Sequence, residues 1–242
     1  MASMDVDVFI PCFIDQLFPE TAFNMIKVLE STGCNINYKK DQTCCGQLAF
    51  NSGYWDDAKE VGENFIKQYS GDRYIVIPSG SCCGFTRNYY GMLFENTVYH
   101  NRFKKIKPKI VEFTEFLTDV LNITHFNAKL EGKATYHDGC GSLRECDIKN
   151  APRKLLENIK GLDLIELKDA ETCCGFGGSF SVKFEAISTA MGRNKAENIQ
   201  SSEVDYVISG DLSCLMHIGG ILKKQNSKVK TMHIADALAS GW

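Results

Sequence analysis

The segment Gln42-Thr43-Cys44-Cys45-Gly46 returns 129 residues later as Glu171-Thr172-Cys173-Cys174-Gly175. A lone cysteine precedes each pair across 31 or 32 intervening residues, and another follows it across 36 or 39. These flanking cysteines are Cys12 and Cys82 in the first copy and Cys140 and Cys214 in the second. The repeat contains eight of the eleven cysteines. We therefore interpret it as a duplicated thiol site, in preference to free cysteines that serve only as small apolar core residues.

The duplication extends to the segments around the cysteines. Residues 74–82, with the sequence YIVIPSGSC, parallel residues 206–214, with the sequence YVISGDLSC. A period of about 130 residues is too long for a solenoid repeat and is typical of two domains that each hold a small core. We expect a first cysteine-rich half over residues 1–130, which includes a connecting segment from about residue 95. The second cysteine-rich half is expected over residues 131–242.

The composition limits the partners and the compartment. The chain has 44% hydrophobic residues, 24% charged residues and a net charge of −3, so it lacks the basic excess of a general nucleic-acid-binding protein. No apolar run reaches the ~20 residues of a membrane span, and the acidic start lacks the basic region of a signal peptide. We therefore expect a cytoplasmic protein whose reduced cysteines serve metal or redox chemistry.

Apolar periodicity places strands directly before the repeated cysteines. The predicted strands cover residues 5–10, 35–39, 73–78, 133–137, 162–167 and 205–209. The predicted helices cover residues 19–33, 55–69, 112–121 and 181–199. This alternation favours an α/β fold of two pseudo-symmetric halves with parallel sheets. Because the carboxyl ends of parallel strands share one edge, loops from distant segments can bring four thiols together in each half.

The adjacent cysteines favour one kind of metal site over another. Structural zinc sites usually have two to four residues between paired cysteines, and neighbouring residues are awkward as two corners of one small tetrahedron. An iron–sulfur cluster relaxes this demand because two adjacent thiolates can bind different irons, and it also carries electrons. Zinc binding and thiol–disulfide redox chemistry remain as alternatives. The segment Gly175-Phe176-Gly177-Gly178 is not a dinucleotide fingerprint, and no flavin or nicotinamide site is recognised.

The cysteine pattern and several longer strings carry a family resemblance. These strings are Cys44-Cys45-Gly46-Gln47, Asn51-Ser52-Gly53-Tyr54, Ser79-Gly80-Ser81-Cys82, Cys173-Cys174-Gly175-Phe176-Gly177-Gly178, Cys214-Leu215-Met216-His217-Ile218-Gly219-Gly220 and Met232-His233-Ile234-Ala235. On these residues the chain resembles the CCG cysteine-rich domain family. That family includes the B subunit of heterodisulfide reductase and the iron–sulfur subunits of glycolate- and glycerol-3-phosphate-oxidising enzymes. Over essentially the whole chain it is similar to the stand-alone lactate utilisation A proteins.

The resemblance implies an oxidoreductase subunit that is active only with partner proteins. It implies a multi-protein system that oxidises L-lactate to pyruvate, with lactate utilisation B and C proteins as partners. It also implies that the eight repeated cysteines bind clusters through which electrons pass. A heterodisulfide-reductase-like or glycolate-oxidase-like electron-transfer subunit is one alternative, and a zinc-bound structural scaffold is another.

The chain departs from the reductase pattern at the end of each half. The reductase relatives use a fifth cysteine there, where this chain has Ser79 and Asp211. Four cysteines per half suit one 4Fe–4S cluster per half, with Ser79 and Asp211 as hydrogen-bonding residues or additional oxygen ligands. Cys83 is a further candidate ligand because it follows Cys82. Two cysteines outside the repeat are interpreted as packing residues, and they are Cys34 and Cys146.

Three residues of the second half are candidates for catalysis. His137 lies three residues before Cys140, and His217 lies three residues after Cys214, so either imidazole could move a proton near the second site. A structural hydrogen bond beside the site is the alternative for both. Arg144 could hold a carboxylate through two parallel hydrogen bonds, or it could be an exposed charge.

Overall fold

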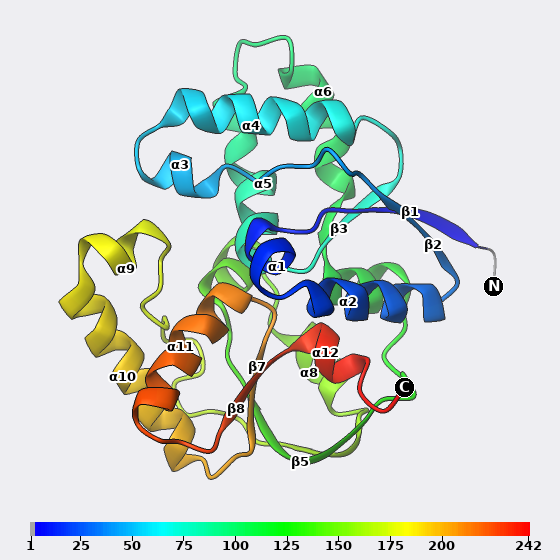
Figure 1. The fold of residues 1–242 in the computed structure, drawn as a ribbon. Coiled ribbons are helices and arrows are strands. Elements are labelled where there is room, and N and C mark those ends of the chain that lie inside the picture. Colours follow the sequence, from blue (N-terminus) through cyan, green and yellow to red (C-terminus); the bar gives the residue numbers. More distant parts are fainter. Residues whose placement is uncertain (1–2) are drawn as a thin grey trace.

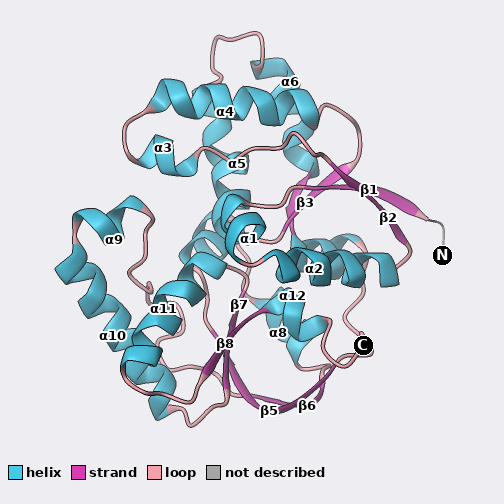
Figure 2. Cartoon of the chain, viewed as in Figure 1, coloured by secondary structure: helices cyan, strands magenta, loops and turns pink. Residues whose placement is uncertain are grey.

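The computed structural model describes residues 3–242, whose strands form two sheets of four parallel strands each (Figures 1 and 2). The first sheet has the order β2-β1-β3-β4, with β1 Met4–Val8, β2 Cys34–Tyr38, β3 Tyr74–Ile77 and β4 Ile110–Glu112. The second has the order β6-β5-β7-β8, with β5 Lys129–Tyr136, β6 Lys160–Leu164, β7 Tyr206–Ser209 and β8 Lys230–His233. The two sheets therefore have the same topology, and the prediction of two pseudo-symmetric α/β halves is confirmed.

The strand register follows the sequence repeat. In the first sheet, Val6 of β1 lies opposite Tyr74 of β3. In the second sheet, Ala134 of β5 lies opposite Tyr206 of β7. Val6 and Ala134 are separated by the same 128 residues as Cys12 and Cys140. The duplication therefore preserves the pairing of the central strands residue by residue.

The first sheet is buried on both faces. Helix α2 (Pro19–Ser31) covers one face, where it packs with Val6, Val8 and Val76. Helices α4 (Trp55–Gln68), α5 (Gly80–Leu93) and α6 (His100–Ile106) lie over the other face, which buries Phe9, Ile75 and Ile77 in an aromatic cluster. Successive residues of β1 and β3 alternate between the faces, as the two-residue period of a strand requires.

The second half repeats this arrangement. Helices α10 (Glu185–Ser201) and α11 (Leu212–Lys224) pack on its outer face, and α8 (Asn150–Leu156) lies between the two sheets with α2 and α12 (Ile234–Leu238) (Figure 1). The helix predicted over residues 181–199 is divided in two. The short α9 (Ser179–Lys183) ends at Phe184, whose φ of −131° and ψ of 52° are not helical, and α10 follows.

The two halves exchange their last helices across the interface. The chain turns from β4 into α7 (Phe113–Glu115) and the π-helical turn η2 (Phe116–Val120), which pack on α8 of the second half. In return, α12 from the end of the chain packs on α2 of the first half. Asp236 of α12 accepts hydrogen bonds from Thr21 and Asn24, each at 2.9 Å. The core between the sheets is therefore built from both halves.

A close backbone contact joins the halves near the repeated cysteines. Helix α5 crosses the π-helical turn η3 (Gly141–Glu145) at Gly80 and Gly141. A Cβ atom on Gly80 would lie 1.9 Å from the Oγ atom of Ser142, and one on Gly141 would lie 2.5 Å from the Cα atom of Ser81. Only glycine allows this approach.

Two features of the fold differ from the sequence prediction. The helix expected from Glu112 begins instead at Phe113, because Glu112 ends β4 and caps α7 through hydrogen bonds from the backbone of Thr114 and Glu115. The short strands β4 and β8, which complete the two sheets, were not predicted. Among residues 3–242, no helix combines the length and the apolar character needed to cross a bilayer.

Candidate metal centres

The four repeated cysteines of the first half meet at the carboxyl edge of the first sheet. Cys12 begins α1 (Cys12–Leu17) after β1, Cys44 and Cys45 lie in the loop after β2, and Cys82 lies in the first turn of α5 after β3. The Sγ atoms of Cys12 and Cys44 are 3.7 Å apart, and those of Cys45 and Cys82 are 3.4 Å apart. The predicted convergence of these thiols is therefore observed.

The second half brings its cysteines together in the same way. Cys140 follows β5, Cys173 and Cys174 lie in the loop after β6, and Cys214 lies in the first turn of α11 after β7. The thiol of Cys140 hydrogen bonds to Cys173, and that of Cys174 hydrogen bonds to Cys214. The four sulfurs are thus paired in the same order as in the first half.

A glycine after each cysteine pair shapes the loop. Gly46 and Gly175 both have a φ of +90°, a left-handed conformation that side chains disfavour. The backbone N–H of each glycine points at the preceding pair, donating to Cys44 at 3.4 Å and to Cys173 at 3.3 Å. Such N–H···S hydrogen bonds are typical of the groups that orient thiolate ligands and tune metal centres.

Each site lowers the pKa of one thiol in its central pair. The pKa of Cys44 is lowered because Cys12, Cys45 and backbone N–H groups donate hydrogen bonds to it. The pKa of Cys173 is lowered in the same way, with Cys140 as the principal donor. The donors themselves have raised pKa values, so each site holds a thiolate stabilised by its neighbours. A thiolate is the form of cysteine that binds metals.

The donor set fits a thiolate-bound metal centre. Four sulfurs per site are the ligands that iron–sulfur clusters and zinc both accept. With metal–sulfur bonds of about 2.3 Å, two ligands of one tetrahedral metal lie roughly 3.8 Å apart. The observed separation of 3.7 Å between the sulfurs of Cys12 and Cys44 is close to this value. Eight convergent thiols in two sets are therefore candidates for two metal centres.

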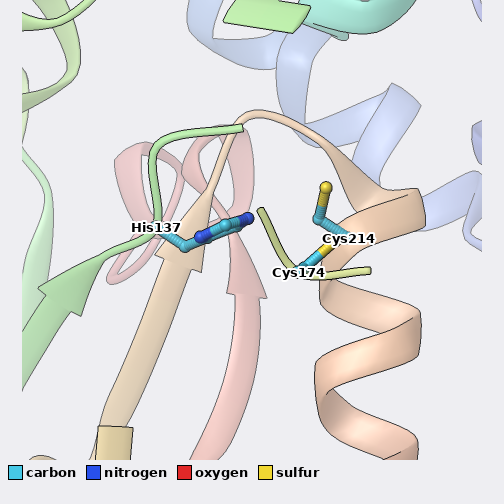
Figure 3. Close-up of side chains that lie close together, drawn as sticks. All are labelled: His137, Cys174 and Cys214. Carbon is cyan, nitrogen blue, oxygen red and sulfur yellow. The ribbon is translucent and has the colours of Figure 1, made fainter. Parts of the chain in front are cut away.

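His137 lies at the second centre, as the sequence predicted. Its ring is fully buried, and its ligand atom lies within 4.8 Å of the sulfurs of Cys174 and Cys214 (Figure 3). Neither ring nitrogen has a hydrogen-bond partner of ordinary geometry within residues 3–242, although the carbonyl group of Ala170 lies nearby. Burial, together with the charge of Lys195, lowers the pKa of His137 to about 3, so the imidazole is neutral.

The other catalytic candidates lie farther from the thiols. The Nε2 atom of His217 lies 3.3 Å from the carbonyl oxygen and 3.5 Å from the Oγ atom of Ser188, which favours the structural interpretation of this histidine. Arg144 is exposed and lines a cleft of about 640 Å³ that also contains Cys173. Within the described chain Arg144 forms no ion pair, so its guanidinium is free to meet an anion.

Ser79 and Asp211 hydrogen bond to each other across the interface. The Oδ1 atom of Asp211 accepts from the hydroxyl of Ser79 at 2.8 Å and from the hydroxyl and backbone of Ser81 at 2.9 and 3.1 Å. Its Oδ2 atom accepts from Ser142 at 3.2 Å. These contacts give the two equivalent positions a role in joining the halves.

The cysteines outside the repeat lie away from the four-thiol sets. Cys83 is fully buried beside Cys146 and the guanidinium of Arg87, and burial raises its pKa. Cys146 also contacts the carbonyl oxygen of Gly80 at 3.6 Å. Cys34 is buried in the core next to Thr32, consistent with a packing role.

Sequence reasoning missed two residues that support the sites. Tyr90 is fully buried, and its hydroxyl donates to the carbonyl oxygen of Cys45 at 2.7 Å. Lys195 is buried, and its ammonium donates to the carbonyl oxygens of Asp169 and Ala170 at 2.8 and 3.2 Å, in the loop that leads to Cys173. A polar residue at an apolar position of a predicted helix was the only signal available for Lys195.

Comparison with known proteins agrees with this architecture. A family model described as "Cysteine-rich domain" matches residues 6–92 and 134–219, so the chain consists mainly of two such domains in tandem. It is 43% identical over 237 residues to Lactate utilization protein A of Geobacillus sp. (strain WCH70), which covers 98% of this chain and 100% of that protein. It is 40% identical over 235 residues to Lactate utilization protein A of Anoxybacillus flavithermus, covering 97% and 99%. The chain therefore belongs to the lactate utilisation protein A family of cysteine-rich domain proteins.

A solved structure shares the fold alone. The crystal structure of a hypothetical protein from Helicobacter pylori superposes with a TM-score of 0.62 at 12% sequence identity. The match covers 98% of this chain and 49% of that one. Both sheets and their order are therefore compatible with very different sequences.

Proposed function

We propose that this chain is the iron–sulfur subunit of a multi-protein system that oxidises L-lactate to pyruvate. The observation that carries the proposal is the pair of matched sites, each with four converging thiols and a backbone N–H group directed at a sulfur. The lactate utilisation proteins to which the chain is similar supply the substrate. Cys12, Cys44, Cys45 and Cys82 would hold one 4Fe–4S cluster, and Cys140, Cys173, Cys174 and Cys214 a second.

The bound clusters would accept and release single electrons, which zinc cannot do. The chain's own contribution is to hold the thiols at two matched positions and to place two halves in direct contact at Gly80 and Gly141. Thiolate ligands require reduced cysteines, so the proposal places the chain in the reducing cytoplasm.

The cleft at the second centre is the proposed position for a carboxylate. It is lined by Arg144 and Cys173, and by Arg153, whose guanidinium is already occupied by Asp138 and Glu166. Arg144 is therefore the residue that can hold the carboxylate of lactate or pyruvate through two hydrogen bonds.

Partner proteins would dock beside the cysteine loops. The segments that follow the two cysteine pairs, α3 (Gln47–Asn51) and α9, expose large apolar side chains. Leu48 is 55% exposed and Val182 is 83% exposed. The segments also meet, because a Cβ atom on Gly178 would lie 3.4 Å from the Cδ1 atom of Leu48. We propose this surface as the contact for the lactate utilisation B and C proteins, since exposed apolar patches mark interaction sites.

The decisive experiment is anaerobic reconstitution with iron and sulfide, followed by addition of the partner proteins. The loaded protein should be brown, should bleach on reduction and should support lactate-dependent reduction of a dye. A protein that takes up iron and sulfide but gives no lactate-dependent reduction with either partner would refute the lactate assignment while leaving the clusters intact.

A zinc-bound scaffold is the second candidate. The separation of 3.7 Å between the sulfurs of Cys12 and Cys44 matches two ligands of one tetrahedral metal and favours this alternative. A colourless protein that retains zinc after anaerobic purification, and takes up no iron, would establish the scaffold.

A further inference from the structure

His137 and Phe9 occupy equivalent positions in the two halves. Each lies three residues before the lone cysteine of its site. The backbone N–H of Phe9 donates to the carbonyl oxygen of Val76 at 3.1 Å, and that of His137 donates to the carbonyl oxygen of Ile208 at 2.8 Å. Because the same backbone accepts a phenyl ring in the first half, the fold itself does not require an imidazole at this position.

The neighbouring helix shows the same replacement. The glycines after the two cysteine pairs approach the carbonyl oxygens of Ala58 and Ser188, so these two residues are equivalent. Seven residues further along the helices stand Phe65 in the first half and Lys195 in the second. Phe9 and Phe65 pack edge to face, with ring centroids 5.2 Å apart. The apolar ring pair of the first half is therefore a histidine and a lysine in the second.

The imidazole of His137 points at the sulfurs and has no other occupation. Figure 3 shows its ring directed toward Cys174 and Cys214, with the ligand atoms of all three within 4.8 Å of one another. The ammonium of Lys195 is engaged by two backbone carbonyl groups and so does not satisfy the ring. Buried polar groups in folded proteins almost always have a partner. A neutral imidazole beside thiolates has a lone pair suited to a metal.

We propose that His137 is a nitrogen ligand of the metal centre in the second half, so that the two centres of the chain have different donor sets. The inference rests on the proposed function in requiring a centre at these thiols. The first centre is bound by sulfur alone and faces Phe9. Replacing thiolate by neutral imidazole ligation raises the reduction potential of iron–sulfur centres, so the second centre is expected to be the easier one to reduce.

The test compares His137→Phe, which copies the first half, with the control Phe9→Leu. Both are made in a Cys45→Ser background, where the second centre alone gives a signal. Pulsed electron paramagnetic resonance of the reduced Cys45→Ser protein should show the ¹⁴N coupling of a coordinated imidazole. His137→Phe should abolish the coupling and lower the midpoint potential, whereas Phe9→Leu should change neither. The variant His137→Cys should retain iron at a lower potential, because it restores a ligand as thiolate.

Two results would overturn the assignment. One is a reduced second centre without nitrogen coupling, and the other is a coupling that persists in His137→Phe. If the sites bind zinc instead, the proposed electron-transfer function fails, and X-ray absorption at the zinc edge tests the ligand separately. Imidazole scattering that disappears in His137→Phe would support the ligand, and scattering from sulfur alone would refute it. A protein that binds neither metal would refute both proposals.

Discussion

The two centres share a backbone but have different surroundings. The first is enclosed by aromatic rings, since Phe9 packs on both Phe65 and Tyr69, and Tyr90 donates to the loop of the cysteine pair. At the second, His137 and Lys195 replace two of these rings, and an open polar cleft reaches Cys173. The duplication has kept what positions the thiols and changed what surrounds them.

This difference teaches which features the thiol geometry needs. Both halves retain the left-handed glycine after the cysteine pair and the hydrogen-bonded thiol pairs. They do not retain the polarity of the enclosing side chains, which controls the potential and the access of a metal centre. The two centres are therefore expected to be unequal partners, and the following predictions test that comparison.

The largest effect is expected from removing one thiol of a central pair. Cys174→Ser should lose the iron of the second half and abolish lactate-dependent electron transfer, while the first half keeps its cluster. Cys45→Ser should do the reverse for iron, because each half carries its own four thiolates. Iron and sulfide analysis after anaerobic reconstitution measures both losses. Some destabilisation accompanies them because a bound metal lends folding energy to its loops.

The matched controls are cysteines outside the repeat. Cys34→Ala and Cys146→Ala should leave the iron content unchanged, since both thiols lie apart from the four-thiol sets. Full iron and full activity in Cys174→Ser would show that the second half is not a metal centre and would end the comparison.

The next effect is the pH dependence of stability, which should have opposite signs at two equivalent residues. Glu112 and His233 each end the last strand of a half and cap the helix that follows. Burial raises the pKa of Glu112 from 4.5 to about 7. Its contribution to stability is therefore present below pH 4.5 and is lost as the pH rises to about 7, a change on the order of 3 kcal/mol.

For His233, burial lowers the pKa below its usual 6.5. Its contribution is therefore present above pH 6.5 and is lost as the pH falls below that value. Glu112→Gln should remove the loss on the alkaline side, and His233→Gln the loss on the acid side. Urea unfolding between pH 5 and pH 8 measures both, and identical pH profiles for wild type and Glu112→Gln would contradict the burial of an ionisable carboxyl group.

A smaller loss is expected at the contact between the halves. Gly80→Ala would place a Cβ atom 1.9 Å from the Oγ atom of Ser142. Overpacking of this kind costs about 1–3 kcal/mol, and it should affect both halves because α5 and η3 belong to different ones. The control Gly220→Ala lies in α11 with open space around it and should stabilise the protein by up to about 1 kcal/mol. Thermal unfolding of both variants distinguishes a tight contact from a loose one.

The smallest effect concerns partner docking. Val182→Asp should weaken association with the partner proteins several-fold, because a charge then stands on the exposed apolar surface of α9. Val98→Asp is the matched control, since Val98 is equally exposed, at 82%, but lies outside this surface. Binding measured by titration should separate the two variants, and equal weakening would place the docking surface elsewhere.

The thiol sites were predictable because they follow from the alternation of strands and helices. A cysteine after each strand end, repeated with the same spacing, was sufficient to place four thiols at one edge. The contrast between Phe9 and His137 was also present in the sequence, once the two lone cysteines were aligned. That of Phe65 and Lys195 needed the helices to be superposed as well.

The missing parts depend on tertiary contacts that leave no periodic signal. Strand β4 has three residues and β8 has four, too few to show an alternating pattern. The burial of Glu112 was hidden because a capping carboxylate and an exposed helical carboxylate look alike in sequence. The contact of Gly80 with η3 comes from the other half and has no local signature.

The exchange of last helices has a consequence for how the chain is made. Asp236, which holds Thr21 and Asn24 of α2, is the 236th residue to leave the ribosome. The inner face of the first half therefore remains uncovered through almost the whole of synthesis, although domains usually fold as the N-terminal part emerges. Contacts across more than 200 residues also slow folding, since the long loop must close first. The two halves are accordingly expected to mature together, at the end of translation.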